Sequence, residues 1–168
     1  VVTTKARSAP AMAFLNPWAS PQGEGFQLIQ SLYGLGAGGL FGVGLFNSRQ
    51  KYSFLPFAES DFIFSIIGEE LGFVGAAFVV LVFVALIVAL IIIARRAKTR
   101  YSMLLVAGVA SVIAVQTILN IAVVTGSIPP TGLPLPFISA GSTSLIVFMS
   151  AVGLCLNVAK QSKSSNLG

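Results

Sequence analysis

The sequence has 168 residues, of which 55% are hydrophobic and only 9% are charged, and its mean hydropathy is +0.92. A soluble domain usually carries about 25% charged residues, so this composition predicts that most of the surface does not face water. The net charge of +5 does not indicate nucleic-acid binding, because Lys and Arg gather at the ends of apolar runs. The absence of His excludes imidazole catalysis, and the single Cys155 excludes a disulfide framework.

Residues 1–60 are predicted to form a large extracellular loop, because they contain no run long enough to span a membrane. The chain starts with Val-Val and shows no signal-peptide pattern, so we interpret it as the C-terminal part of a longer protein. The glycines between Gly34 and Gly44 favour turns and close backbone approaches over a regular helix. Aromatic residues such as Trp18 and Tyr33 are unlike a linker and predict a folded segment on the membrane surface or against the helices.

Two uncharged runs, at residues 71–94 and 101–159, predict the membrane spans. A span needs about 20 apolar residues, so the first run holds one span and the second holds two. The basic residues that follow each run predict the cytoplasmic side. Between the second and third spans, a segment rich in Pro and Gly cannot be a continuous helix, and it is predicted to form a re-entrant loop on the external side. The predicted segments after the first loop are a span at 61–94, a basic loop at 95–100, a span at 101–124, the re-entrant loop at 125–144, a span at 145–159 and a cytoplasmic tail at 160–168.

The predicted fold class is therefore an all-α polytopic membrane protein. The chain would contribute the C-terminal three transmembrane helices of a larger bundle and a long structured extracellular loop.

All five acidic residues precede the first uncharged run, and Asp61 lies at the outer end of the first predicted span. Position alone favours a helix N-cap or a partner of the helix dipole for Asp61, although an acid near lipid is also a candidate site. A helix that starts at Ser60 would exceed the hydrocarbon core, which predicts a bend or a close helix contact at Gly68 and Gly72. It would also place Asp61 and Glu69 within about 80° of each other on one face.

The remaining polar residues allow two interpretations each. Gln116 and Asn120 are four residues apart and share a helix face, from which they either bond to a neighbouring helix, the favoured reading, or line a substrate path. Arg49 and Lys51 are cations just before Asp61, and they either hold a phosphate or anchor at lipid headgroups.

Several motifs follow one another along the chain, at residues 16–18, 25–31, 42–51, 61–64, 68–72, 131–139 and 141–145. In order and spacing they resemble the large external loop and the last helices of the SEDS family (FtsW, RodA and SpoVE) over roughly residues 13–158. The Asn-Ser-x-Gln-Lys stretch that ends at Lys51 is more similar to the FtsW and SpoVE branch than to RodA. One departure is Phe57, where the family commonly has Glu after Leu-Pro.

The resemblance implies a peptidoglycan glycosyltransferase of the bacterial cell membrane that polymerises lipid II. It also implies a class B penicillin-binding protein and other divisome proteins as partners. The essential aspartate of the family corresponds to Asp61, as the catalytic residue. The residues implied to bind substrate are Arg49, Gln50, Lys51, Glu69, Gln116, Asn120, Ser139 and Ser142.

A single carboxylate suits this chemistry, because the pyrophosphate of lipid II leaves as a stable anion and needs no general acid. Arg49 and Lys51, or a divalent cation such as Mg²⁺ or Mn²⁺, are expected to neutralise the leaving charge. Two alternatives from other classes stay open at this point. One is a flippase or transporter for a lipid-linked precursor, and the other is a membrane scaffold that activates a penicillin-binding protein.

Overall fold

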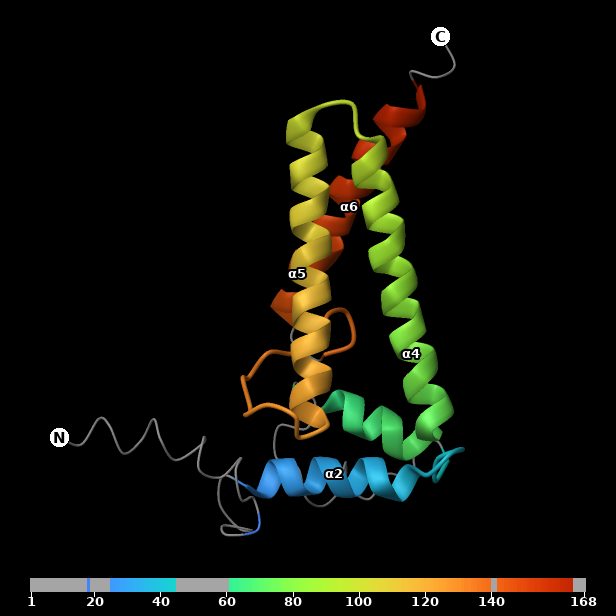
Figure 1. The fold of residues 1–168 in the computed structure, drawn as a ribbon, viewed down its shortest axis with the longest axis vertical. Coiled ribbons are helices and arrows are strands. Elements are labelled where there is room, and N and C mark those ends of the chain that lie inside the picture. The colour runs from blue at the N-terminus through green and yellow to red at the C-terminus, as the bar shows by residue number, and fades with distance from the viewer. Residues whose placement is uncertain (1–17, 19–24, 45–60, 140–141, 165–168) are drawn as a thin grey trace, which may run out of the picture.

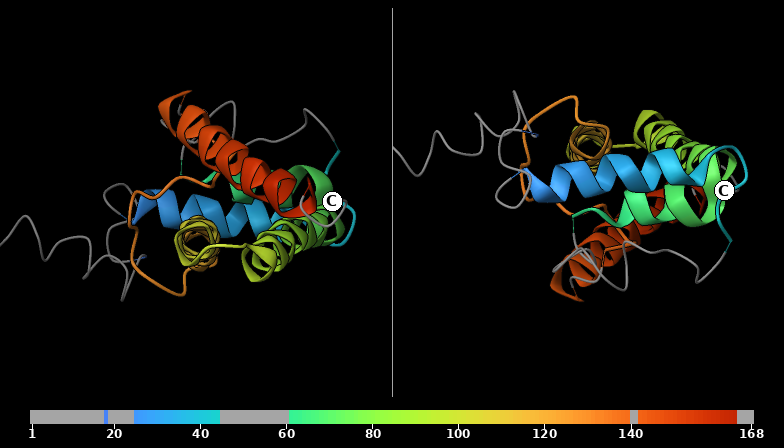
Figure 2. Two further views of the ribbon diagram at one scale, coloured as in Figure 1. Left: turned by 90° about the horizontal axis from the view of Figure 1, so that it is seen from above. Right: turned by 90° about the horizontal axis from the view of Figure 1, so that it is seen from below.

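The computed structural model describes residues 18, 25–44, 61–139 and 142–164, and these residues form helices and loops without a strand. In chain order the helices are α2 (Phe26–Gly38), α4 (Ile63–Arg96), α5 (Arg100–Val124) and α6 (Ser142–Ser164). Figure 1 shows α5, α6 and most of α4 running along the long axis of the molecule, with α2 and the start of α4 lying crosswise at one end. The views along the long axis place α2 over the ends of α4 and α5 (Figure 2).

The three long helices α4, α5 and α6 are long and apolar enough to cross a membrane. Their apolar side chains point outward as well as inward, since Phe78, Leu81, Ile118 and Ile146 are each well exposed. Outward apolar side chains suit contact with lipid or with further helices, where a soluble protein would place polar groups. The prediction of an all-helical polytopic membrane protein is confirmed.

Local interactions define where α4 and α5 end and begin at the end of the molecule that carries Arg95, Arg96 and Arg100, called the basic end below. Arg95 and Arg96 occupy the last turn of α4, where cations stabilise the helix dipole. Thr99 caps α5, and its Oγ1 accepts a hydrogen bond from the amide of Ser102 at 3.1 Å. The hydroxyl of Ser162 in α6 donates to the carbonyl of Arg96 at 2.6 Å, which ties the ends of α4 and α6 together.

The segment between α5 and α6 is not helical through residue 139, as expected from its four prolines. It packs onto the bundle, because Leu135 is fully buried in the core between the long helices. Phe137 has a left-handed backbone with a φ of 66°, which is rare for a bulky residue. Its ring lies between Phe83 of α4 and Phe148 of α6, with centroid distances of 6.5 and 5.6 Å.

The expectation of turns throughout the glycine-rich segment is wrong for its first half, because α2 continues through Gly34 and Gly36 to Gly38. Tertiary contact explains this helix better than intrinsic propensity does. Gly38 lies so close to α4 that a Cβ atom there would overlap the carbonyl oxygen of Gly68. The predicted close helix contact at Gly68 is therefore confirmed.

The predicted bend at Gly72 is also confirmed. Gly72 has a φ of 69° and a ψ of −168°, which interrupts α4 and divides it into a short arm (residues 63–71) and a long arm (residues 73–96). In an unbroken helix the amides of Phe73 and Val74 would donate to the carbonyls of Glu69 and Glu70. At this break those four backbone groups need other hydrogen-bond partners. An unpaired backbone amide or carbonyl costs free energy in an apolar environment.

Residues 39–44, the loop that follows α2, supply all four partners. The loop uses two amides and two carbonyls, so it is inserted into the hydrogen-bond ladder of α4. Gly42 lies against the carbonyl of Glu70, where no side chain fits. The four bonds run from Val43 N to Glu69 O (2.9 Å), Gly44 N to Glu70 O (3.1 Å), Phe73 N to Gly39 O (2.9 Å) and Val74 N to Leu40 O (3.2 Å).

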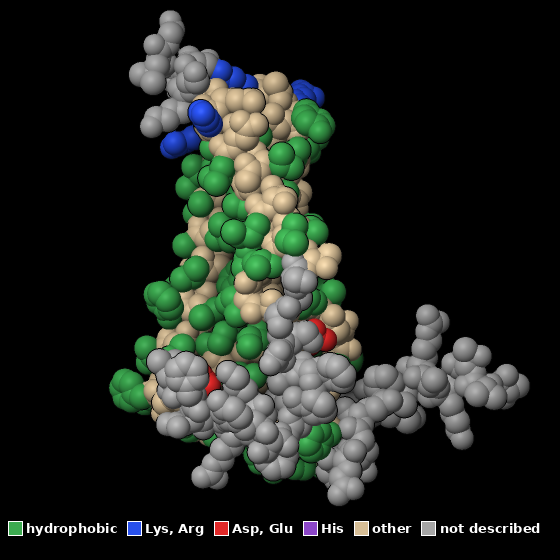
Figure 3. Space-filling view, turned by 180° about the vertical axis from the view of Figure 1, so that it is seen from behind, with side chains coloured by type: hydrophobic (Ala, Val, Ile, Leu, Met, Phe, Trp, Pro, Cys, Tyr) green, Lys and Arg blue, Asp and Glu red, His purple; other side chains and the backbone are tan. Residues whose placement is uncertain are grey.

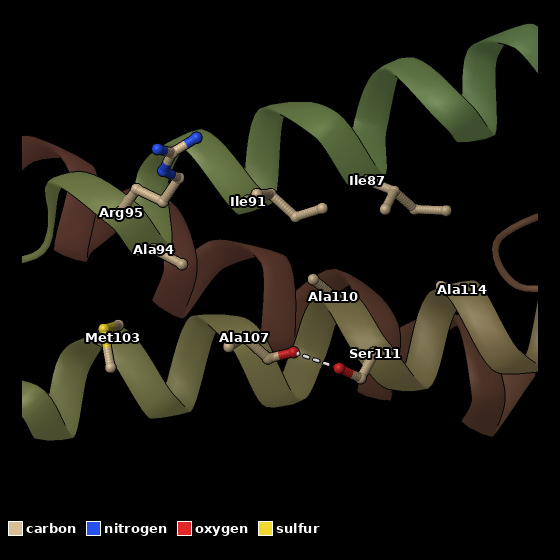
Figure 4. Close-up of a pocket in the computed structure, with 9 residues that line it drawn as sticks. All are labelled: Ile87, Ile91, Ala94, Arg95, Met103, Ala107, Ala110, Ser111 and Ala114. Atoms are coloured by element: carbon tan, nitrogen blue, oxygen red, sulfur yellow. Dashed lines mark hydrogen bonds between the residues drawn. The ribbon is translucent and has the colours of Figure 1, made fainter.

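A groove with a cavity volume of about 360 Å³ separates α4 from α5 near their connection. Ile87 and Ile91 of α4 face small residues of α5, among them Ala107, Ala110 and Ala114 (Figure 4). The hydroxyl of Ser111 is satisfied within α5 by the carbonyl of Ala107 at 2.8 Å. This groove lies at the basic end of the helices, away from Asp61.

Candidate active site

Asp61 stands two residues before the first residue of α4 and is partly exposed. The helix starts at Ile63 with Phe62 as its N-cap residue and no side-chain cap, so the interpretation of Asp61 as the N-cap is wrong. The premise of a helix starting at Ser60, which would have put Asp61 and Glu69 on one face, is likewise not met. Within the described part of the chain, the Asp61 carboxylate has no hydrogen-bond or ion-pair partner.

Gly132, from the loop between α5 and α6, lies beside the Asp61 carboxylate. A Cβ atom at position 132 would stand 3.7 Å from Asp61 Oδ2, and Gly132 itself is exposed with a φ of 66°. Among the described residues, the carboxylate therefore borders the bare backbone of Gly132. Sequence reasoning did not single out this contact, although Gly132 stands in one of the motifs that carry the family resemblance.

The amides of Gln116 and Asn120 converge on the same loop from the face of α5 that they share. Gln116 Nε2 donates to the carbonyl of Pro134 at 2.8 Å. Asn120 Nδ2 donates to the carbonyl of Leu133 and to the backbone carbonyl of Asp61, both at 2.8 Å. Sequence reasoning favoured bonds to a neighbouring helix, whereas these bonds reach loop carbonyls and the residue that carries the candidate carboxylate.

The other predicted substrate-binding residues are placed in different ways. Glu69 is only 2% exposed within the short arm, and Ser139 is 7% exposed with its Oγ buried and unpaired among the described residues. Ser142 is the first residue of α6. Their contacts with substrate stay predictions. Arg49, Gln50 and Lys51 lie outside the described residues.

Ser31 is a structural residue of this end that sequence reasoning passed over. It is fully buried in α2, and its hydroxyl donates to the carbonyl of Val124 at the end of α5 at 2.9 Å. This bond joins α2 to α5 across 93 positions of sequence, so spacing alone could not reveal it.

Charge separates the two ends of the described molecule. The acidic side chains of the described residues lie near α2, and the basic side chains lie at the opposite end (Figure 3). These basic residues are those from Arg95 to Arg100 and Lys160. Asp61, the break at Gly72 and the crosswise helix α2 share the acidic end. These features define a polytopic membrane protein with a candidate carboxylate site at one end of its helices.

A family model matches nearly the whole chain. The family model FTSW_RODA_SPOVE, described as "Cell cycle protein", matches residues 1–164. The chain is 50% identical over 151 residues to Stage V sporulation protein E of Bacillus subtilis, covering 90% of this chain and 41% of that protein. It is 45% identical over 158 residues to a probable peptidoglycan glycosyltransferase FtsW of Trichlorobacter lovleyi, covering 94% and 42%. The chain belongs to the FtsW/RodA/SpoVE family.

A solved structure agrees with this assignment. It concerns the structural coordination of polymerization and crosslinking by a peptidoglycan synthase complex, and it matches with a TM-score of 0.72 and 32% sequence identity. The match covers 90% of this chain and 41% of the solved chain. The chain thus spans less than half the length of the relatives that it matches.

Proposed function

We propose that the full-length protein containing this chain is a peptidoglycan glycosyltransferase that polymerises lipid II, with Asp61 as its general base. The observation that carries the proposal is the Asp61 carboxylate, which is partly exposed and has no partner within the described residues. A carboxylate engaged in capping or an ion pair is less available to accept a proton than a free one. Relatives named as probable peptidoglycan glycosyltransferases support the same reading.

The reaction needs one base at this position. A sugar 4-hydroxyl of one substrate attacks the anomeric carbon of another, and Asp61 accepts the hydroxyl proton as the new C–O bond forms. The bond between the anomeric carbon and the lipid pyrophosphate breaks, and its electron pair leaves with the pyrophosphate. Because pyrophosphate is a stable anion, it departs without a proton, whereas an alkoxide leaving group requires a second carboxyl as acid.

An apolar groove at the same end supports a lipid-linked substrate. It has a cavity volume of about 640 Å³ and lies between α2 and both arms of α4. Leu35 of α2 and Phe64 at the start of the short arm line one part of it, and Val80 and Leu81 line it along the long arm. A groove with these walls fits a hydrocarbon chain beside the short arm that follows Asp61.

The cationic part of the proposal rests on the family resemblance. Arg49 and Lys51 are proposed to stabilise the leaving pyrophosphate, and alanine at either position should lower turnover without unfolding the protein. No three His, Cys, Asp or Glu side chains gather to hold a metal ion in the described segments. Mg²⁺ is commonly held by only one or two carboxylates together with substrate phosphates, so a divalent cation stays a proposal of the resemblance and no step of the reaction is assigned to it.

The charge distribution supports an orientation in the bacterial cell membrane. We place the basic end and the C-terminus in the cytoplasm and Asp61 outside, following the bias of Lys and Arg towards cytoplasmic loops. Single cysteines introduced as Phe41→Cys and Lys160→Cys, in a Cys155→Ser background, test this orientation in intact cells. Labelling of position 41 alone by an impermeant thiol reagent is expected, and labelling of position 160 alone would contradict it.

The partner proposal follows from the structural neighbour. A class B penicillin-binding protein is proposed to bind the full-length protein, because the neighbour comes from a complex that couples polymerization to crosslinking. Co-purification of the two proteins from membranes tests this pairing, and other divisome proteins would join through them. The transport alternative is weakened by Gln116 and Asn120, whose amide nitrogens bond to backbone carbonyls and not to an open path.

Polymerisation of purified lipid II by the full-length protein with its partner synthase tests the catalytic role. Asp61→Asn keeps the size of the side chain and removes the base, so glycan strands should fall by at least about 10²-fold. The matched control is Glu70→Gln, the same exchange at an acid of the short arm, which should polymerise normally. Undiminished polymerisation by Asp61→Asn would contradict the proposal, as would an equal loss in both variants.

A further inference from the structure

Asn120 joins the two pieces of backbone that flank the candidate carboxylate. It is 1% exposed on α5, and both hydrogens of its amide nitrogen are used, one towards Asp61 O and one towards Leu133 O. Both acceptors are carbonyls, so the nitrogen and not the oxygen of the amide must face them. The bond to Asp61 spans 59 positions of sequence and the bond to Leu133 spans 13.

The two bonds set the geometry around the Asp61 carboxylate. Leu133 follows Gly132, whose backbone lies beside Asp61 Oδ2. Asn120 therefore fixes the main chain of Asp61 relative to the surface that its carboxylate faces. The Asp61 side chain has only two rotatable bonds, so fixing its backbone confines the carboxylate to a small volume.

We propose that Asn120 is a positioning residue for the Asp61 carboxylate. It acts by holding the backbone of Asp61 against the backbone of Leu133, and it does not touch the substrate. This inference rests on the proposed function of Asp61 as the base. It assigns Asn120 a role different from the substrate contact implied by the family resemblance.

The start of α4 explains why such a residue is needed. The helix has no side-chain cap, and the local bonds to the carbonyl of Phe62, from the amide and hydroxyl of Ser65, do not involve Asp61. Among the described residues, the Asn120 amide is the side chain that bonds to the backbone of Asp61. Because a displacement of about 1 Å in a reacting group can cost about 10²-fold in rate, loss of this bond should reach the chemical step.

The test uses steady-state polymerisation by the full-length protein with its partner synthase. Asn120→Ala should lower kcat between about 10-fold and 10²-fold and leave the KM for lipid II within about twofold. Asn120→Leu keeps the branched shape of the side chain, although it is larger, and removes the donors, so it should give the same loss and carries the test where the alanine variant folds poorly. Asn120→Asp replaces the donor with a carboxylate that faces two carbonyls, and it should lose at least as much activity.

Two control variants separate positioning from other roles. Thr117→Val removes a buried hydroxyl one turn away on α5 that has no partner in the described structure, and it should retain wild-type kcat. Gln116→Ala removes the bond to Pro134 O, which anchors the same loop without involving Asp61, so its loss of kcat should be smaller than that of Asn120→Ala.

The outcomes distinguish this inference from the proposed function. An unchanged kcat in Asn120→Leu, while Asp61→Asn is inactive, would overturn the positioning role and leave Asp61 as the base. A raised KM with unchanged kcat would assign Asn120 to substrate binding instead. An equal loss in Gln116→Ala would reduce Asn120 to an anchor of the loop. Full activity of Asp61→Asn would end the proposed function itself.

Discussion

Gly38, the last residue of α2, lies directly against the backbone of Gly68 in the short arm of α4. A Cβ atom at position 38 would overlap the Gly68 carbonyl oxygen, and a backbone atom cannot move aside as a flexible side chain can. Because neither glycine has a side chain, the backbones of α2 and α4 can approach each other closely at this point.

This contact predicts that Gly38→Ala lowers the free energy of unfolding of the full-length protein by about 1–3 kcal/mol, as overpacking does elsewhere. Thermal unfolding in detergent measures the effect. The control is Gly36→Ala in the same helix, where a Cβ would have nothing within 4 Å, so it should be neutral or stabilising by up to about 1 kcal/mol. Equal midpoints for the two variants would contradict the contact.

A methyl group beside the Asp61 carboxylate should reduce activity, and two glycines allow a matched comparison. Gly132→Ala and Gly126→Ala both place a side chain on a left-handed backbone, with φ values of 66° and 69°. Both Cβ atoms would also have ordinary contacts, at 3.7 Å to Asp61 Oδ2 and at 3.6 Å to the Leu32 side chain respectively. The stability losses should be similar, at about 1–2 kcal/mol.

If Asp61 is the base as proposed, polymerisation should fall only in Gly132→Ala, because only that methyl group desolvates the Asp61 carboxylate and narrows the approach to it. The measurement is kcat/KM for lipid II at a temperature where both variants are folded. A parallel loss in Gly126→Ala would show that backbone strain, and not proximity to Asp61, is responsible.

The bond from Ser31 to the carbonyl of Val124 should contribute measurably to the packing of α2. Ser31→Ala leaves a buried carbonyl without this donor, so we expect a loss of about 1–3 kcal/mol in the free energy of unfolding. Ser111→Ala removes an exposed hydroxyl that bonds only to its own helix and should change stability by less than about 0.5 kcal/mol. Urea unfolding of both variants in mixed micelles is the measurement, and an unaffected Ser31→Ala would count against a link between α2 and α5.

Phe137 combines aromatic packing with an unfavourable backbone, and two substitutions separate these effects. Both Phe137→Ala and Phe137→Gly remove the ring that lies between Phe83 and Phe148, so both should be destabilised by several kcal/mol. Only glycine accepts the φ of 66° without steric cost, so the glycine variant should be the more stable of the two. Thermal melting ranks them, and the reverse order would mean that the backbone relaxes when the ring is removed.

The helical class and the three spans could be predicted because they depend on composition over long windows. A run without charge indicates a span irrespective of what surrounds it. The bend at Gly72 was also accessible, since a helix much longer than the hydrocarbon core has to break or project, and glycine marks the place. These are properties of local sequence and of the membrane thickness.

The packing of α2 and the geometry of the site depend on distant residues, and there the sequence was a weaker guide. Glycine propensity argued against a helix at Gly34 and Gly36, but contact with α4 overrides it. The spacing of Gln116 and Asn120 showed that they share a helix face. It did not show which part of the chain that face contacts. The hydrogen bond between Asn120 and the Asp61 backbone joins residues 59 positions apart, and the local sequence around either residue does not predict it.

The interruption of α4 has a geometric consequence for catalysis. Ile63, the first residue of the short arm, lies about 14 Å from Gly72 at a rise of 1.5 Å per residue, and Asp61 lies two residues beyond it. A rotation of the short arm by about 10° about Gly72 would then carry the carboxylate through about 3 Å, several times the tolerance of about 0.5 Å for a catalytic group. Because residues 39–44 hold both sides of the break, they fix this angle. The loop after α2 and the Asn120 amide therefore hold the short arm at its two ends, one at the break and the other at Asp61.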